Sequence, residues 1–316
     1  DWTASGGHLM SASVGALSAA IVALLVQLVI TSVRFVIVLR VFDIACGFWE
    51  SLRCNLIGSF FTQTFLSFLG GDLARVWFVT RLDVSVRTAT GIVLLDRAWG
   101  LIVNILLVLV GVVPLLHAAA EPVLRWGLVI LWAAGLTGVV GFFLLGLLHD
   151  AVRAGAALVP WPRLRKAADL AADLATISRH SMRSWRLSAA LFATSLTIHL
   201  ITVLIVQILV NALGGGIGFA VCLIVVPTII LITMIPVSIG GWGVRENAMV
   251  IGLGLFSIAG DKALAASVLF GVLSLLFGLA GGFAWLADTR GRRTRDDALQ
   301  AKSAAPAGHD PAIPPR

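Results

Sequence analysis

Long apolar runs fill most of the chain, and short polar or glycine-rich stretches separate them. The runs lack the alternation of a β-strand, and each is long enough to cross about 30 Å of hydrocarbon as a helix. Five such spans are predicted, at Val14–Val33, Thr88–Leu116, Val123–Leu148, Leu187–Val210 and Ala263–Ala287. The pattern therefore predicts an all-α protein, a polytopic transmembrane helical bundle.

Two further regions are apolar but interrupted. Gly47–Leu69 carries several charged and amide residues, too many for a clean lipid-facing span. Ile217–Ile235 leads into the glycine-rich stretch Pro236–Asn247, and then into Ala248–Ile258, which is about half a membrane long. We expect re-entrant or broken helices in both regions. The second pair of segments either crosses the membrane twice or enters and returns.

Composition excludes several classes of protein. Hydrophobic residues make up 59% of the chain and charged residues 12%, against about 25% charged in an average soluble domain. A water-soluble enzyme or binding module cannot hide so much apolar surface. The net charge of +7 comes largely from basic loops and the tail, so we expect no nucleic-acid partner. The three cysteines and six histidines stand apart, so we expect no disulfide framework, no metal site and no cofactor.

The long polar loop His149–Arg186 is rich in Lys and Arg. Its apolar residues recur at helical spacing, so part of it is predicted to be an interfacial amphipathic helix. Because basic segments stay on the cytoplasmic side, the loop and the C-terminal tail are predicted to be cytoplasmic in an inner-membrane protein. The predicted organisation is a single transmembrane domain over 1–287, with repeat one at about 14–116, a linking span and loop at 117–186, repeat two at about 187–287, and a flexible tail at 288–316.

An internal self-match divides the chain into two related halves. Gly70–Arg75 and Gly240–Arg245 both read GGxxxR, and each stands between an interrupted segment and a span. With the orientation above, the first interrupted segment enters from the cytoplasm and the second from outside, which is the inverted-topology repeat of transporters. Glycines would break the helix, and a helix that starts after them points its positive end at the midplane. The predicted hinge residues are Gly70, Gly71, Pro236, Gly240, Gly241 and Gly243.

Charged residues near these breaks are the candidates for binding a phosphate headgroup. Arg97 lies about nine residues into its span, roughly 13 Å at the rise of a helix. A charge at that depth is costly unless it is paired or hydrated, and Asp72 is a candidate partner for Arg97. The alternatives are an arginine that reaches the lipid phosphates at the interface, a local charge balance, or a structural ion pair. The predicted substrate-binding residues are Arg75, Arg97, Arg245, Glu246, Asp72 and Asp96.

Motifs of catalysis are missing from the sequence. It contains no GxSxG, no HExxH, no Walker A and no dinucleotide fingerprint. We therefore expect neither an enzyme nor a transporter that hydrolyses ATP by itself.

Three segments resemble the lysylphosphatidylglycerol synthase transmembrane-region family. These are flippase-like membrane proteins, which include the lipid-translocating domain of the bacterial multiple peptide resistance factor. Within Gly58–Leu101 the chain has the GGDxxR run at Gly70–Arg75 and the DRxxGL run at Asp96–Leu101. The later Pro–Ser–Gly–Gly–x–Gly–x–Arg–Glu signature is found at Pro236–Glu246. The resemblance covers about residues 15–287 in layout.

The resemblance implies lipid flipping or transport of a lipid headgroup. The three candidate arginines would attract a phosphate-headed lipid, aminoacylated or polyprenyl-linked in some cases, and the three acids would balance them or read a cationic group. The alternatives are a non-transporting scaffold or lipid-presenting partner of a separate transferase, and an intramembrane enzyme. One departure is that the family often has Asn-Gln and Leu-Pro before its GGD, where this chain has Thr62-Gln63 and Phe65-Leu66.

Overall fold

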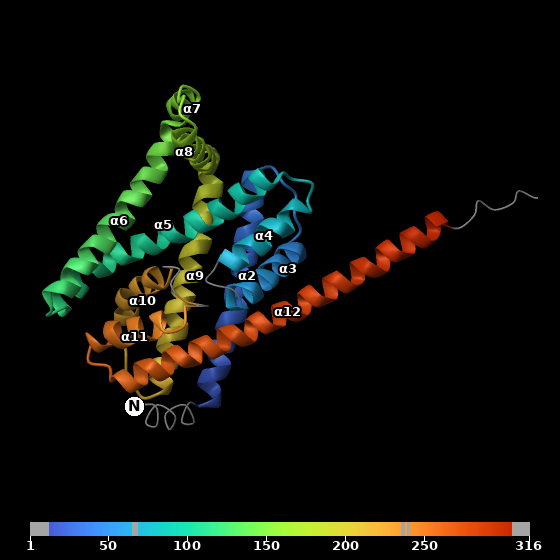
Figure 1. Cartoon of the computed structure of the whole chain (residues 1–316). Coiled ribbons are helices and arrows are strands. Elements are labelled where there is room, and N and C mark those ends of the chain that lie inside the picture. Colours follow the sequence, from blue (N-terminus) through green and yellow to red (C-terminus); the bar gives the residue numbers. More distant parts are fainter. Residues whose placement is uncertain (1–12, 65–68, 235–237, 239–240, 305–316) are drawn as a thin grey trace, which may run out of the picture.

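The computed structural model describes residues 13–64, 69–234, 238 and 241–304, with side chains as far as residue 287. Within these ranges eleven helices, α2 to α12, follow one another and no strand is found (Figure 1). The all-α fold predicted from the apolar runs is confirmed.

Five helices are long and apolar enough to cross a membrane. They are α2 (Val14–Val41), α5 (Val86–Ala118), α6 (Pro122–Leu147), α9 (Trp185–Ala212) and the Gly260–Ala287 part of α12. Each coincides with one of the five predicted spans, so the polytopic helical bundle is confirmed. The first helix is longer than predicted, because the apolar residues that follow Arg34 continue it to Val41.

Local sequence sets where the spans begin. At the start of α2 the Ser13 hydroxyl accepts a hydrogen bond from the backbone N–H of Ala16 at 3.2 Å. At the start of α5 the Ser85 hydroxyl accepts one from the N–H of Thr88 at 3.1 Å. These bonds satisfy donors that a helix cannot pair internally. Helix α6 begins at Pro122, whose missing N–H costs nothing in a first turn.

Four shorter helices form two pairs. The first pair is α3 (Phe48–Thr64) and α4 (Leu69–Thr80), which pack against each other, and the second is α10 (Phe219–Thr233) and α11 (Val244–Gly254), which do the same. At about 1.5 Å per residue, the 15 residues of α10 and the 11 of α11 each fall short of the roughly 30 Å of a hydrocarbon core. This length favours broken or re-entrant helices over two further crossings.

The helix contacts support the predicted repeat. The pair α2 and α9 packs together, α3 packs on α2 and α12, and α10 packs on α9 and α5. Exchanging α2 with α9, α3 with α10, α4 with α11 and α5 with α12 reproduces these contacts. A pair of repeats related by a two-fold axis would give this arrangement, so the inverted repeat stays a prediction with this support.

The predicted glycine hinges differ between the two halves. Gly70 and Gly71 lie inside α4, which begins at Leu69, so the structure has no helix break at these two glycines. Gly71 instead allows close approach, because a Cβ there would lie 2.6 Å from the carbonyl oxygen of Gly58. Gly241 and Gly243 lie ahead of α11 with φ of +79° and +84°, a conformation that glycine adopts without strain. Pro236 and Gly240 lie outside the described residues.

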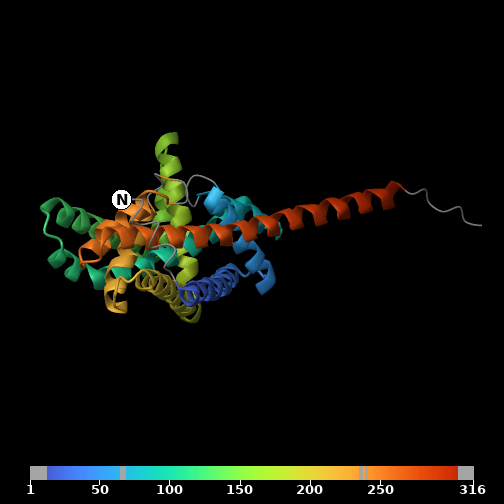
Figure 2. The same ribbon diagram turned by 90° about the horizontal axis from the view of Figure 1, so that it is seen from below.

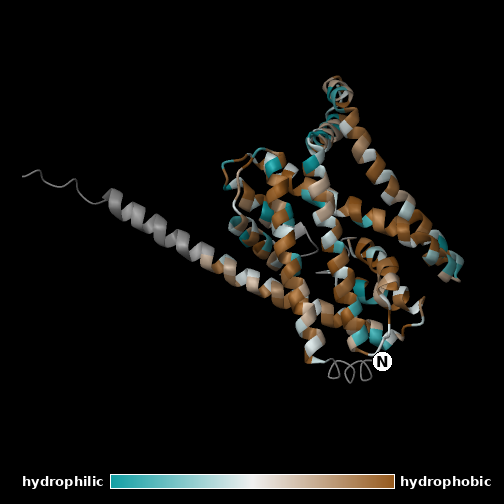
Figure 3. Cartoon of the chain, turned by 180° about the vertical axis from the view of Figure 1, so that it is seen from behind, coloured by the Kyte–Doolittle hydropathy of each residue, from teal (hydrophilic) through white to brown (hydrophobic). Residues whose placement is uncertain are grey.

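The predicted polar loop folds into α7 (His149–Ala157) and α8 (Pro162–Met182). The predicted amphipathic helix is α8, which buries Ala175 and Ile177 on one side, and hydrophilic residues gather on α7 and α8 at one end of the bundle (Figure 3). Figure 2 shows α12 running well beyond the other helices. Its backbone is helical to Ala304, where the sequence predicted a flexible tail from 288 onward. Residues up to Ala304 include many helix formers, and the first proline of the tail, Pro306, comes only afterwards.

Glycines set the distance between α3 and α12. A Cβ on Gly281 would lie 1.9 Å from the carbonyl oxygen of Leu56, and one on Gly282 would lie 2.8 Å from the ring of Phe60. Small residues at helix contacts let backbones approach closely, which is a main source of packing energy inside a bilayer. The glycines of α12 therefore hold the first helix pair against the second half of the bundle.

Replacing Gly281 with alanine is expected to destabilise the protein by about 1–3 kcal/mol, because the helices must separate to admit the methyl group. The matched control is Gly141→Ala on α6, where a Cβ would meet nothing within 4 Å. The control should be neutral or slightly stabilising, because alanine is the better helix former. The measurement is the apparent melting temperature of each purified variant in detergent. Equal shifts in both variants would contradict the close contact.

Candidate functional site

A buried ion cluster joins α2, α4 and α5 at the centre of the bundle. Arg34 Nε donates to Asp96 Oδ1 at 2.9 Å and Arg34 Nη2 donates to Asp96 Oδ2 at 3.0 Å. Arg75 Nη1 donates to the same Oδ2 at 3.2 Å, and Arg34 Nη1 donates to the Ser195 hydroxyl of α9 at 3.3 Å. We call Arg34, Arg75, Asp96 and Ser195 the central cluster. Its fork between Arg34 and Asp96 is the strong, planar form of an ion pair.

The central cluster has a net charge of +1, because two arginines share the single carboxylate of Asp96. Asp96 is 1% exposed, Arg34 8% and Arg75 9%, so two cations and one anion are withdrawn from solvent together. Arg75 Nε is buried and has no hydrogen-bond acceptor among the described residues. Gly58 makes room for it, since a Cβ there would lie 3.0 Å from that nitrogen. An excess buried charge with a free donor is a feature that an anionic ligand would satisfy.

A second ion pair connects α4 and α5 beside the central cluster. Arg97 Nε donates to both oxygens of Asp72, at 2.9 and 3.0 Å, and Arg97 Nη2 lies 2.7 Å from Oδ1. The predicted pairing of Asp72 with Arg97 is therefore observed. These side chains are more exposed than those of the central cluster. The pairs Arg75–Asp96 and Arg97–Asp72 thus join the same two helices with opposite polarity.

A second charged group lies where α11 meets α12. It consists of Arg245 and Glu246 of α11 and Ser267 of α12, and we call it the α11 cluster. Arg245 Nη2 donates to Glu246 Oε1 at 2.9 Å, and Arg245 Nε donates to the Ser267 hydroxyl at 3.1 Å. The same hydroxyl donates to Glu246 Oε1 at 3.1 Å, and the N–H of Gly243 donates to Glu246 Oε2. The α11 cluster is therefore neutral, unlike the central cluster.

Aromatic rings and a glycine shape the position of Arg245. Its guanidinium lies 5.0 Å from the ring centre of Trp242 and 5.6 Å from that of Phe270, within the range of cation–π attraction. A Cβ on Gly271 would lie 2.3 Å from Arg245 Nη2. The arginine is thus held between two rings against the bare backbone of α12.

Four of the predicted binding residues come together and two form a separate group. Asp72, Arg75, Asp96 and Arg97 lie between α4 and α5, and Arg245 with Glu246 forms the α11 cluster. Arg34 is not among the residues predicted from the sequence, because the first predicted span ends one residue earlier, at Val33. The signal was present, since apolar residues follow Arg34 for two further turns of α2. No group of three or more His, Cys, Asp or Glu residues in the described part of the chain could hold a metal ion.

The bundle as a whole matches one known family of membrane proteins. The family model described as the lysylphosphatidylglycerol synthase TM region covers residues 1–282. This chain belongs to that family. No curated protein and no solved structure matches it. The resemblance predicted from three sequence segments is confirmed, and family membership together with five helices of spanning length makes this an integral membrane protein.

The segments that resemble the lysylphosphatidylglycerol synthase TM family lie at the two clusters. The GGDxxR run supplies Asp72 and Arg75, and the DRxxGL run supplies Asp96 and Arg97. The glycine of the DRxxGL run, Gly100, also has a local purpose: a Cβ there would lie 3.3 Å from Arg34 Nη1. Its carbonyl oxygen lies 2.9 Å from His199 Nε2, which ties α5 to α9 at this level.

Replacing Asp96 with asparagine is expected to destabilise the protein by about 3–5 kcal/mol, because it leaves two buried arginines without a counter-charge. Arg75→Gln should cost much less, since the fork between Arg34 and Asp96 then forms a balanced pair. The double variant Arg34→Gln with Asp96→Asn should recover part of the loss from Asp96→Asn. Apparent melting temperatures of the purified variants test this order. A larger loss from Arg75→Gln than from Asp96→Asn would contradict it.

Proposed function

We propose that this protein moves a phosphate-headed lipid between the two leaflets of the membrane. The observation that carries the proposal is the excess positive charge of the central cluster, which is buried between helices and includes residues of the spanning helices α2 and α5. Charges inside a membrane domain are costly, and they are kept where they line the path of an ion or a polar substrate. The family is described after an enzyme of a phospholipid, lysylphosphatidylglycerol, which agrees with a lipid substrate.

Arg75 is the residue through which the headgroup would bind. Its Nε is a buried donor without an acceptor, and its Nη1 makes the longest contact to Asp96 in the cluster, at 3.2 Å. A phosphate oxygen could accept from Nε, and from Nη2 beside it, because a guanidinium presents these two donors as a planar fork that fits phosphate, while Nη1 stays on Asp96. Asp96 would remain neutralised by Arg34 while the phosphate neutralised Arg75.

The α11 cluster would act at the second half of the path. Arg245 is neutralised by Glu246 when no lipid is bound, so a passing phosphate would compete with that carboxylate for the guanidinium. The carboxylate would then be free to meet a cationic part of the headgroup, such as an aminoacyl group. Glu246 keeps two other donors, the N–H of Gly243 and the Ser267 hydroxyl, so it need not move far.

Two apolar cavities could hold the lipid tail while the headgroup crosses. One, of about 330 Å³, lies between α3, α4 and α12, where Leu73, Trp77 and Trp285 line it. The other, of about 370 Å³, lies between α5, α6, α10 and α11, where Leu115 and Ile251 are among the lining residues. The two cavities occupy corresponding places in the two halves of the chain, because the proposed repeat exchanges α3 with α10, α4 with α11 and α12 with α5. An acyl chain in either one would avoid exposing apolar surface to the polar path.

Arg75→Gln is expected to slow lipid translocation about tenfold or more, because a lost charge-assisted contact to phosphate is worth at least about 1.4 kcal/mol. The measurement uses the full chain reconstituted in liposomes that contain a headgroup-labelled phospholipid, with a membrane-impermeant quencher outside. Arg245→Gln should slow translocation as well. The matched control is Arg163→Gln, an exposed arginine of α8 that should leave the rate within about twofold of wild type.

The same experiment separates the proposal from the scaffold alternative. If the protein is a scaffold or a lipid-presenting partner of a transferase, liposomes with the wild-type protein should translocate lipid no faster than protein-free liposomes. Wild-type rates in both Arg75→Gln and Arg245→Gln would also overturn the proposal. Arg75→Lys keeps the charge without the planar fork, so its translocation rate is expected to lie between those of wild type and Arg75→Gln. Size-exclusion chromatography of each purified variant checks that the fold survives.

We infer further that α7, α8 and the C-terminal tail face the cytoplasm in an inner membrane. The support is the basic composition of α8 and of the residues after 287. The link between α2 and α3 lies at the same end, because the ring of Phe42 stacks on that of His180 with centres 5.3 Å apart. Cys46 is in this link, while Cys54 and Cys222 are buried, so Cys46 can report the orientation.

Cys46 is expected to react with a membrane-impermeant maleimide from the cytoplasmic side only, in inside-out vesicles and not in intact spheroplasts. Burial and the negative charge of Glu50 raise the pKa of the Cys46 thiol to about 11. Because only the thiolate reacts, the labelling rate should rise about tenfold per pH unit between pH 7 and pH 9. Glu50→Gln removes a charge that raises this pKa, so it should speed labelling at a given pH. Labelling from the outside alone would reverse the assigned orientation.

A further inference from the structure

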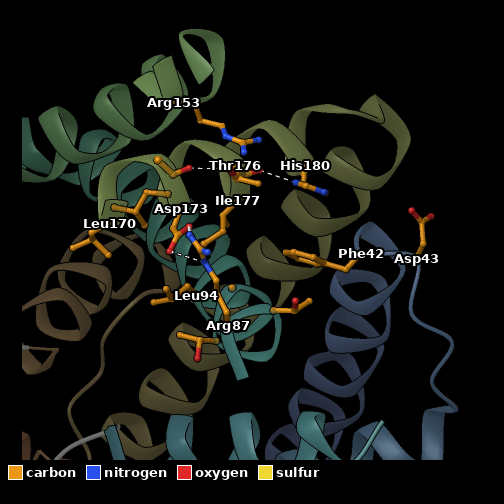
Figure 4. Close-up of a pocket in the computed structure, with 15 residues that line it drawn as sticks. Phe42, Asp43, Arg87, Leu94, Arg153, Leu170, Asp173, Thr176, Ile177 and His180 are labelled. Carbon is orange, nitrogen blue, oxygen red and sulfur yellow. Dashed lines mark hydrogen bonds and ion pairs between the residues drawn. The ribbon is translucent and has the colours of Figure 1, made fainter. Parts of the chain in front are cut away.

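A cavity of about 700 Å³ lies under α8, at the ends of two spanning helices (Figure 4). Its lining comes from the residues just after α2, from the first turns of α5, from α7 and from α8. Because α2 ends at Val41 and α5 begins at Val86, the cavity lies where hydrocarbon gives way to the polar interface. On α5 it is lined by Gly91 and Leu94, and Asp96 lies about 200° further round the helix. The cavity is therefore separate from the central cluster.

Part of the cavity lining is apolar. It comes from Phe42, Leu174 and Ile177, together with the more exposed Leu94 and Leu170. The ring of Phe42 lies parallel to that of His180, with an angle of 8° between the planes, and so fixes one wall. Such a surface favours a ligand with an apolar part over a fully hydrated ion.

The charged residues of the lining leave a net positive charge after their ion pairs are taken into account. Arg87 of α5 reaches Asp173 of α8, and Figure 4 shows the two side chains pointing toward each other. Asp43, the other acid of the lining, is paired with Arg183 at 3.1 Å. Arg153 of α7 has no ion-pair partner in the part of the chain that the structure describes. One lining cation is thus left over after both lining carboxylates are neutralised.

The ion pair between Arg87 and Asp173 is easily exchanged. The two side chains are 75% and 37% exposed, so solvent screens their attraction. A phosphate could take the place of the Asp173 carboxylate on Arg87, because the guanidinium binds either group through two parallel hydrogen bonds. Arg153 would add a second charge to the same phosphate.

We propose that the cavity under α8 binds the phosphate of an anionic phospholipid from the adjacent leaflet. Arg87 and Arg153 bind the phosphate, and the apolar lining residues contact the glycerol and the first carbons of a chain. A free phosphate would use the two arginines but would leave the apolar surface uncovered. The bound lipid would connect α5, α7 and α8. This site does not depend on the proposed translocation, since it uses none of the residues of the central cluster.

The test titrates dioctanoyl phosphatidylglycerol into the purified full chain in detergent and follows binding by calorimetry. Hydrogen exchange of residues 164–180 locates the bound lipid, because exchange in α8 should slow when the cavity is filled. Arg153→Gln and Arg87→Gln are each expected to weaken binding about tenfold, the loss of one charge-assisted contact. Arg163→Gln is the matched control, an exposed arginine on α8 outside the cavity, and it should bind as wild type does.

Three comparisons decide the outcome. Dioctanoyl phosphatidylcholine has the same chains without net charge, and it should bind at least about tenfold more weakly. Glycerol phosphate should bind more weakly still, and equal binding of it would overturn the lipid assignment in favour of a soluble anion. Arg75→Gln should leave the protection of α8 unchanged, so a failed translocation assay and a failed cavity can be told apart. Equal affinities of Arg153→Gln and Arg163→Gln would overturn the proposal, and partial recovery in Arg153→Lys would support it.

Discussion

The carboxylate of Asp96 is the group on which the centre of this bundle depends. It is almost fully buried and is the shared acceptor of Arg34 and Arg75, which reach it from α2 and α4. A membrane interior offers no water to replace a lost partner, so α2 and α4 are both bound to α5 through this one carboxylate. The same arrangement leaves one positive charge over, and the site and the stability of the bundle therefore share a single carboxylate.

The two halves of the protein use similar backbones for different electrostatics. Both place an arginine on the short second helix of a pair, Arg75 on α4 and Arg245 on α11. In the first half the acid that Arg75 contacts comes from another helix and is shared by two arginines, which leaves an excess charge. In the second half the acid is the next residue in sequence, so the α11 cluster is neutral.

Close helix packing makes these charges possible. Gly58, Gly100 and Gly271 each stand where a Cβ would press on an arginine of one of the clusters. Gly281 brings the backbone of α12 against that of α3, which holds the first helix pair in place. Small residues at these points let large, forked side chains fit between helices that remain in contact. The cavity under α8 is the opposite case, since the end of α2, the start of α5, α7 and α8 leave about 700 Å³ open between them.

The sequence by itself determined the class of protein, the five spans and one ion pair. Runs of about 20 apolar residues have one solution in lipid, a spanning helix, and a charge as deep as Arg97 calls for a partner, for which Asp72 was the candidate. Only the tertiary structure decided that Arg34 belongs to the site and that Glu246 and Ser267 hold Arg245. The contact between Arg34 and Asp96 joins helices 62 positions apart, and the one between Arg245 and Ser267 joins α11 to α12. Both depend on side-chain packing between helices, which no local pattern encodes.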